Sequence, residues 1–141
     1  MWTKTMVLAV ALGLAGCNAL GLACEEMGCQ GTLTVLLDRL PTEDAALSVD
    51  LGDGPLACGV AGATTEPLCA IEDGDEGPVL SVWVGMGQAP EVVTVSVSEG
   101  GAPAVDHELS VAWGEPWYPN GKACDGKDGG CRSGEAELAL D

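Results

Sequence analysis

The chain has 141 residues, which is room for one domain beside an export signal, and it carries 22 acidic but 5 basic side chains. A surface this negative repels phosphate backbones and anionic lipid headgroups, so nucleic-acid binding is excluded. A hydrophobic fraction of 47% excludes intrinsic disorder, because it is enough to build a core.

Residues 1–16 have the pattern of an export signal. Lys4 makes the start positive, and an apolar run follows over residues 6–15 (MVLAVALGLA). The next motif, Leu14-Ala15-Gly16-Cys17, resembles the lipobox of bacterial lipoproteins. The resemblance implies cleavage before Cys17 by signal peptidase II and a diacylglyceryl group on the cysteine sulfur. The protein is then expected to be exported and held at a membrane by lipid.

Two alternatives to the lipobox are a retained transmembrane helix and ordinary signal cleavage. The apolar run to residue 24 reaches the roughly 20 residues that a spanning helix needs. Gly13, Gly16, Gly21 and the polar Asn18 disfavour such a span.

Asn18 also bears on which membrane is the destination. It follows the lipidated cysteine, where an aspartate would resemble the inner-membrane retention signal of enteric bacteria. By that resemblance the outer membrane is favoured over the inner one.

The chain has seven cysteines, an odd number that is unusual in an exported protein. Assigning Cys17 to lipid leaves an even set for disulfides: Cys24, Cys29, Cys58, Cys69, Cys124 and Cys131. Sequence spacing favours bonds between neighbours, namely Cys24–Cys29, Cys58–Cys69 and Cys124–Cys131. None of the spacings fits the C-x-x-C pattern typical of zinc, and export favours disulfides.

After a short tether (residues 17–23), residues 24–141 form one predicted domain. Apolar and polar residues alternate with period two, which predicts strands over residues 31–37, 47–51, 80–86, 93–98, 108–113 and 135–140, with weaker strands around Cys58 and Cys69. Turn signals such as Asp53-Gly54-Pro55 and Glu99-Gly100-Gly101 separate them. Seven to eight short strands predict an all-β fold, a disulfide-stapled antiparallel β-sandwich of immunoglobulin-like or transthyretin-like topology.

Two acidic, glycine-rich loops are candidate calcium sites, because calcium binds clusters of oxygen ligands. Their acidic residues are Glu72, Asp73, Asp75 and Glu76 in the first loop, and Asp125 and Asp128 in the second. Neither loop has the spacing of an EF-hand. A solvated surface turn is therefore the favoured interpretation of both.

Three aromatic residues, Trp113, Trp117 and Tyr118, are close in a chain that has no Phe. They would form a stacking surface for a sugar or an anchor for a partner protein, or they would plug the end of the sandwich. The plug is favoured because Trp113 is in phase with Leu109 and Val111.

The segment Tyr118-Pro119-Asn120-Gly121, followed by Cys124, Cys131-Arg132 and a last alternating strand, resembles the C-terminal end of some uncharacterised secreted bacterial β-proteins. In those proteins the two cysteines lie closer together, so that residues 125–130 would be an expansion. The resemblance implies no activity.

Catalytic motifs such as G-x-S-x-G, H-E-x-x-H and the P-loop do not occur in the sequence. The single histidine, His107, is in phase with Leu109 and Val111, which favours a structural role. We therefore expect a non-catalytic envelope lipoprotein that binds an envelope protein or serves structurally, with no cofactor required. The alternative is a calcium- or carbohydrate-binding module.

Overall fold

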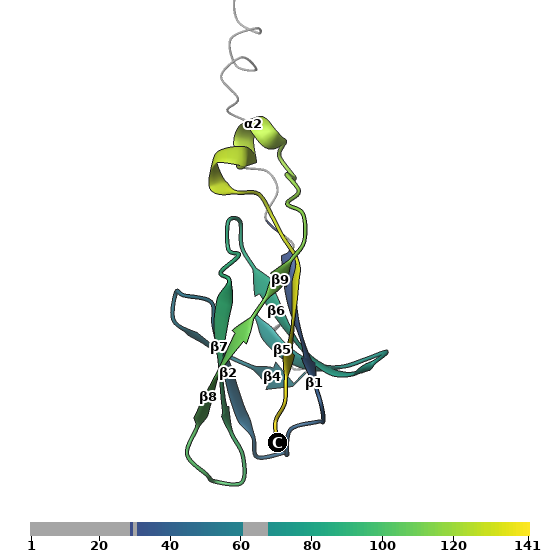
Figure 1. The fold of residues 1–141 in the computed structure, drawn as a ribbon, viewed down its shortest axis with the longest axis vertical. Coiled ribbons are helices and arrows are strands. Elements are labelled where there is room, and N and C mark those ends of the chain that lie inside the picture. Colours follow the sequence, from purple (N-terminus) through teal and green to yellow (C-terminus); the bar gives the residue numbers. More distant parts are fainter. Residues whose placement is uncertain (1–28, 30, 61–67) are drawn as a thin grey trace, which may run out of the picture.

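The computed structural model describes residues 29, 31–60 and 68–141, and it consists mostly of β-strands in two sheets (Figure 1). The predicted signal (residues 1–16), Cys17, the tether and Cys24 lie outside the described residues. In chain order the elements are β1 (Gly31–Leu37), β2 (Ala46–Asp50), β3 (Pro55–Ala57), β4 (Gly59–Val60), β5 (Cys69–Gly74), β6 (Gly77–Val84), β7 (Val92–Ser98), β8 (Val105–Ser110), β9 (Ala112–Trp113), α2 (Lys122–Asp125), η1 (Gly126–Asp128) and β10 (Gly134–Leu138).

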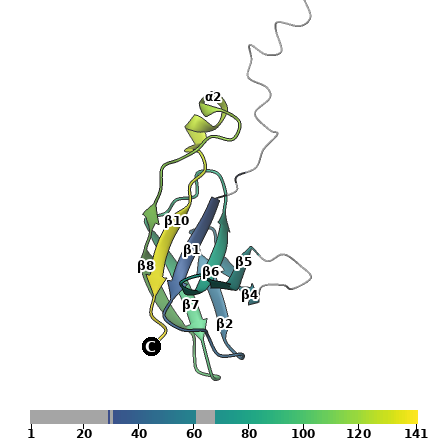
Figure 2. The ribbon, with the colours of Figure 1, turned by 90° about the vertical axis from the view of Figure 1, so that its right-hand side faces the viewer.

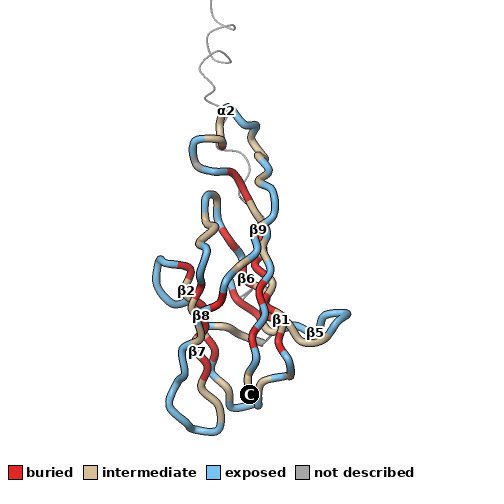
Figure 3. The backbone as a smooth tube through the Cα atoms, viewed as in Figure 1, coloured by how far each residue is buried: buried red, intermediate tan, exposed pale blue. Residues whose placement is uncertain are grey.

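The two sheets share one core, and the predicted period-two alternation is what builds it. Leu33 and Val35 of β1 are fully buried, while Thr32, Thr34 and Leu36 are half-buried on the opposite face. Alternate residues of the second sheet, such as Val49 and Val95, are buried against the same cluster. Successive side chains of a strand point to opposite faces, so each strand contributes one face to the core. The buried residues follow the strands of both layers in Figure 3.

The larger sheet is mixed, so the prediction of a purely antiparallel fold is wrong for this layer. Its strand order is β4-β5-β6-β1-β10-β9, and the smaller sheet has the order β3-β2-β7-β8. β1 pairs with β10 in parallel and with β6 in antiparallel fashion, and β4 pairs with β5 in parallel. Parallel neighbours need a long connection, and β1 and β10 come from far apart in the chain. Alternation of apolar residues carries no information on strand direction.

The structure has more strands than the predicted seven or eight, because two stretches of chain cross between the sheets. The run expected as one strand over residues 108–113 divides at Val111 into β8 in the smaller sheet and β9 in the larger one. β3 and β4 divide in the same way at Cys58. These crossings join the two layers covalently at both edges.

Two disulfides lie in the described residues, and they confirm one of the predicted pairs. Cys58 is bonded to Cys69, as spacing predicted. Cys29 is bonded to Cys131 across 102 residues, so the pairs Cys24–Cys29 and Cys124–Cys131 are wrong. The physical reason is the parallel pairing of β1 and β10. Because Cys29 and Cys131 each precede one of these strands, both lie at the same end of the sheet.

Residues 117–132 form a projection, here called the knob, at one end of the molecule. It contains α2 and η1, and it lies at the opposite end from the C-terminus in two perpendicular views (Figures 1 and 2). Neither short helix was expected from the sequence. In the described residues α2 has four residues and η1 has three.

Candidate functional site

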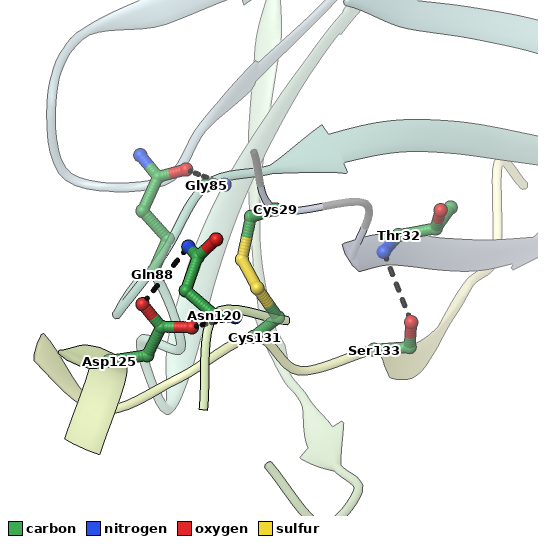
Figure 4. The surroundings of a disulfide bond; sticks show 8 residues. All are labelled: Cys29, Thr32, Gly85, Gln88, Asn120, Asp125, Cys131 and Ser133. Atoms are coloured by element: carbon green, nitrogen blue, oxygen red, sulfur yellow. Dashed lines mark hydrogen bonds between the residues drawn. A yellow bond between two sulfur atoms is a disulfide. The ribbon is translucent and has the colours of Figure 1, made fainter. Parts of the chain in front are cut away.

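The Cys29–Cys131 bond attaches the knob to the start of β1 (Figure 4). The Cα atoms of the two cysteines are 5.5 Å apart. Trp117 and Cys131 pair as an isolated antiparallel bridge, in which each backbone N–H donates to the other residue's carbonyl at 2.8 Å. Two further hydrogen bonds support this junction: Gly87 N–H donates to the Gly130 carbonyl at 2.8 Å, and Thr32 N–H donates to Ser133 Oγ at 3.1 Å. The knob is thus fixed to the β-domain.

Asp125, one of the predicted calcium ligands, organises the interior of the knob. It is only 2% exposed. Its Oδ2 accepts a hydrogen bond from the backbone N–H of Asn120 at 2.8 Å, and its Oδ1 accepts one from Asn120 Nδ2 at 3.2 Å. A buried carboxylate must have such partners, because an unsatisfied one costs a large desolvation free energy. The Asp125 carboxylate therefore stabilises the turn that precedes α2 by accepting hydrogen bonds from Asn120. Asp128 lies in η1.

The other acidic loop is the β5–β6 hairpin. Glu72 and Asp73 belong to β5, Asp75 and Glu76 make the turn, and all four are exposed. Among residues 29, 31–60 and 68–141, no three His, Cys, Asp or Glu side chains are placed to hold a metal ion. The exposure of these four side chains fits a surface turn, and calcium binding by this loop stays a prediction.

The three aromatic residues expected to act together have different surroundings. Trp113 packs against the core, and its Nε1–H donates to the Pro90 carbonyl at 2.7 Å. Trp117 is 38% exposed at the base of the knob, and Tyr118 is half-buried. These contacts support the plug for Trp113 and leave Trp117 as the exposed ring of the three.

A groove of about 330 Å³ is lined by residues of both sheets, among them Leu56 of β3 and Trp83 of β6. Its apolar wall consists of Leu51, Leu56, Leu68, Trp83 and Val84. Leu68 is 58% exposed and Trp83 is 51% exposed, so the apolar wall of the groove is open to solvent.

A polar rim borders the groove. Gln88 Nε2 donates to Asp53 Oδ2 at 2.9 Å, and Gln88 Oε1 accepts from Gly85 N–H at 2.6 Å. Gln88 thereby holds the Asp53 carboxylate in place. Sequence reasoning missed this site. Trp83 could have indicated the site in the sequence, because it is a large aromatic residue at a position where the alternation of β6 predicts a side chain that faces solvent.

The strongest electrostatic cluster lies at the opposite end of the molecule from the knob. Arg39 makes two hydrogen bonds to Glu99, at 2.8 and 2.9 Å, and its Nε donates to Asp141 at 2.9 Å. Thr42 N–H also donates to Glu99, at 2.9 Å. The Arg39 hydrogen bonds are the main reason that the pKa of Glu99 falls from its ordinary 4.5 to about 2. This cluster, here called the clamp, joins the β1–β2 loop to the β7–β8 turn and to Asp141.

His107, the one histidine, lies in β8 opposite Val95 and is half-buried.

In the described part of the chain, no helix is both long and apolar enough to cross a bilayer. No protein family, curated protein or solved structure matches this chain significantly.

Proposed function

We propose that the protein is exported and held at a bacterial envelope membrane by lipid on Cys17, with the β-domain as a non-catalytic binding or structural module. The observation that carries the proposal is that every described cysteine, Cys124 included, is disulfide-bonded. Disulfides of this kind persist outside the cytosol. Export is also what the lipobox resemblance implies, and the outer membrane is the favoured destination.

Counting of cysteines supports the same assignment. Cys29, Cys58, Cys69 and Cys131 are bonded to one another, and Cys124 is also disulfide-bonded. If Cys17 carries lipid, Cys24 is the cysteine left to pair with Cys124. We expect non-reducing peptide mapping of the mature protein to recover a Cys24–Cys124 peptide. Recovery of Cys17 in a disulfide would contradict both assignments.

A binding or structural role fits the placement of the titratable groups. His107 sits within a strand, and Asp125 and Glu99 are engaged in the knob and the clamp. The partner we propose is another envelope protein.

For the fold we propose an immunoglobulin-like or transthyretin-like sandwich, because two sheets with alternating buried residues enclose one core. An experimental structure with a different strand order would contradict that class.

The test of lipid anchoring is Cys17→Ser in the full-length precursor, with Ala19→Ser as the matched control. Cys17→Ser removes the sulfur that receives the diacylglyceryl group, so the chain should keep residues 1–16 and should lack the mass of the acyl chains. Ala19→Ser should be processed and acylated like the parent. An acylated, shortened Cys17→Ser product by intact mass would contradict the proposal.

A second candidate function is carbohydrate binding in the groove. The exposed indole of Trp83 offers a face on which a sugar ring can stack. The Asp53 carboxylate, held by Gln88, can accept hydrogen bonds from sugar hydroxyl groups. We expect a matching glycan to quench tryptophan fluorescence in the parent protein and in Trp117→Phe. Trp83→Ala should abolish that response. An unchanged spectrum across a glycan panel would eliminate this candidate.

A further inference from the structure

The charge of this protein is distributed very unevenly between the knob and the rest of the chain. The knob holds Lys122, Lys127 and Arg132, which are three of the 5 basic residues. It holds only Asp125 and Asp128 of the 22 acidic residues, which leaves 20 acidic and two basic residues elsewhere. The knob thus has a formal charge of +1 in a chain of net charge −17.

The positive groups of the knob are available to a partner. Lys122 and Lys127 are exposed, and Arg132 is half-buried. The ion pairs among the described residues are made by Arg39 with Glu99 and Asp141, far from the knob. Asp125 is buried and bonded to Asn120, so its carboxylate faces inward. The exposed tip of the knob (Figure 3) therefore carries two lysines, Lys122 and Lys127, whose side chains are open to solvent.

The position of the knob relates it to the proposed anchor. Cys29 is bonded to Cys131 within the knob, so the chain before Cys29 starts from this end. Twelve peptide units separate Cys17 from Cys29, a reach of at most about 40 Å when fully extended. If Cys17 carries lipid, the knob is the end of the domain next to the bilayer, and the clamp is the far end.

We propose that the knob rests on an anionic phospholipid surface, with Lys122, Lys127 and Arg132 against the headgroups. This inference rests on the lipid anchor proposed above. An anionic membrane attracts each nearby Lys or Arg by roughly fivefold in binding and repels the acidic body, so both effects favour one orientation. The indole of Trp117, 38% exposed at the base of the knob, suits the headgroup region.

The test uses the mature lipoprotein in vesicles of phosphatidylcholine alone or with phosphatidylglycerol. After signal cleavage Lys122 and Lys127 are the only lysines. A water-soluble amine-acetylating reagent therefore reports on the knob directly, by mass spectrometry. Acetylation of both lysines should be at least roughly fivefold slower on the anionic vesicles. The protection should disappear at 1 M salt, where the Debye length is about 3 Å.

Charge variants test the cause, with Lys127 as the reporter. Lys122→Gln/Arg132→Gln should bring the labelling rates on the two vesicle types close together, and Lys122→Gln alone should do so partly. Ala102→Glu/Ala104→Glu makes the same change in net charge in the β7–β8 turn, and should keep the protection. Melting curves of the variants verify that each is folded.

Equal labelling on both vesicle types, in a protein whose intact mass carries the acyl chains, would overturn the inference and leave the anchor standing. Protection seen in whole cells but not on anionic vesicles would also overturn it, in favour of a protein partner. A mass without acyl chains would instead count against the proposed anchor.

Discussion

At the scale of single residues, Glu99 is a carboxylate whose pKa is strongly lowered by its hydrogen-bond partners. Its hydrogen bonds to Arg39 and Thr42 hold its pKa at about 2, below the ordinary 4.5. A pKa that is lower in the folded state stabilises the fold above the unfolded-state value. That contribution is lost as the pH falls through about 2.

We expect Glu99→Gln to lower the melting temperature at neutral pH. The difference from the parent should shrink below pH 4.5 and vanish only below about pH 2, where both proteins carry a neutral side chain. Glu137→Gln, at an exposed position of β10, is the matched control and should change little. A difference for Glu99→Gln that is independent of pH would show that the clamp does not depend on charge.

Gly31, the first residue of β1, is also constrained. A Cβ atom there would overlap the Arg132 carbonyl oxygen and lie 2.8 Å from Val84 Cγ2. Gly31→Ala should destabilise the protein by about 1–3 kcal/mol or more, since backbone rather than a flexible side chain must move. Gly114→Ala, where the nearest atom is 3.4 Å away, should be tolerated. Urea unfolding compares the two; equal stabilities would mean that this close approach is absent.

At the scale of elements, β1 is the centre of the larger sheet. It lies between β6 and β10, and its alternate residues belong to different faces. Two leucines of β1 can therefore be compared for the effect of burial on stability. Leu33 is fully buried between the sheets, and Leu36 lies on the outer face.

Leu33→Ala should lower the free energy of unfolding by about 2–5 kcal/mol, because it leaves a cavity in the shared core. Leu36→Ala should cost about 1 kcal/mol, as a half-buried position creates no closed cavity. Chemical denaturation measures both values. Equal costs would place the strand in a different register.

At the scale of the whole molecule, the disulfides act over very different chain lengths. Cys58–Cys69 closes a loop of 11 residues, whereas Cys29–Cys131 connects residues 102 apart and so restrains most of the domain. In the chain-entropy description, a longer closed loop removes more freedom from the unfolded state.

In a Cys24→Ser/Cys124→Ser background, where no second bond joins the same two chain segments, Cys29→Ser/Cys131→Ser should therefore lose about 5 kcal/mol and Cys58→Ser/Cys69→Ser about 3 kcal/mol. Thermal or urea unfolding of the two double variants gives the order. The reverse order would indicate that the unfolded chain is already restrained by other contacts.

The sequence by itself determined which residues face the core. Period two is a local property of the strand backbone, so Leu33, Val49 and Val95 were identifiable from their neighbours alone. The close pair Cys58–Cys69 was likewise found from its spacing. Tertiary structure decided the features that depend on chain segments far apart, because local patterns do not encode strand direction or distant proximity. These are the parallel pairing of β1 with β10, the Cys29–Cys131 bond that follows from it, and the groove around Trp83.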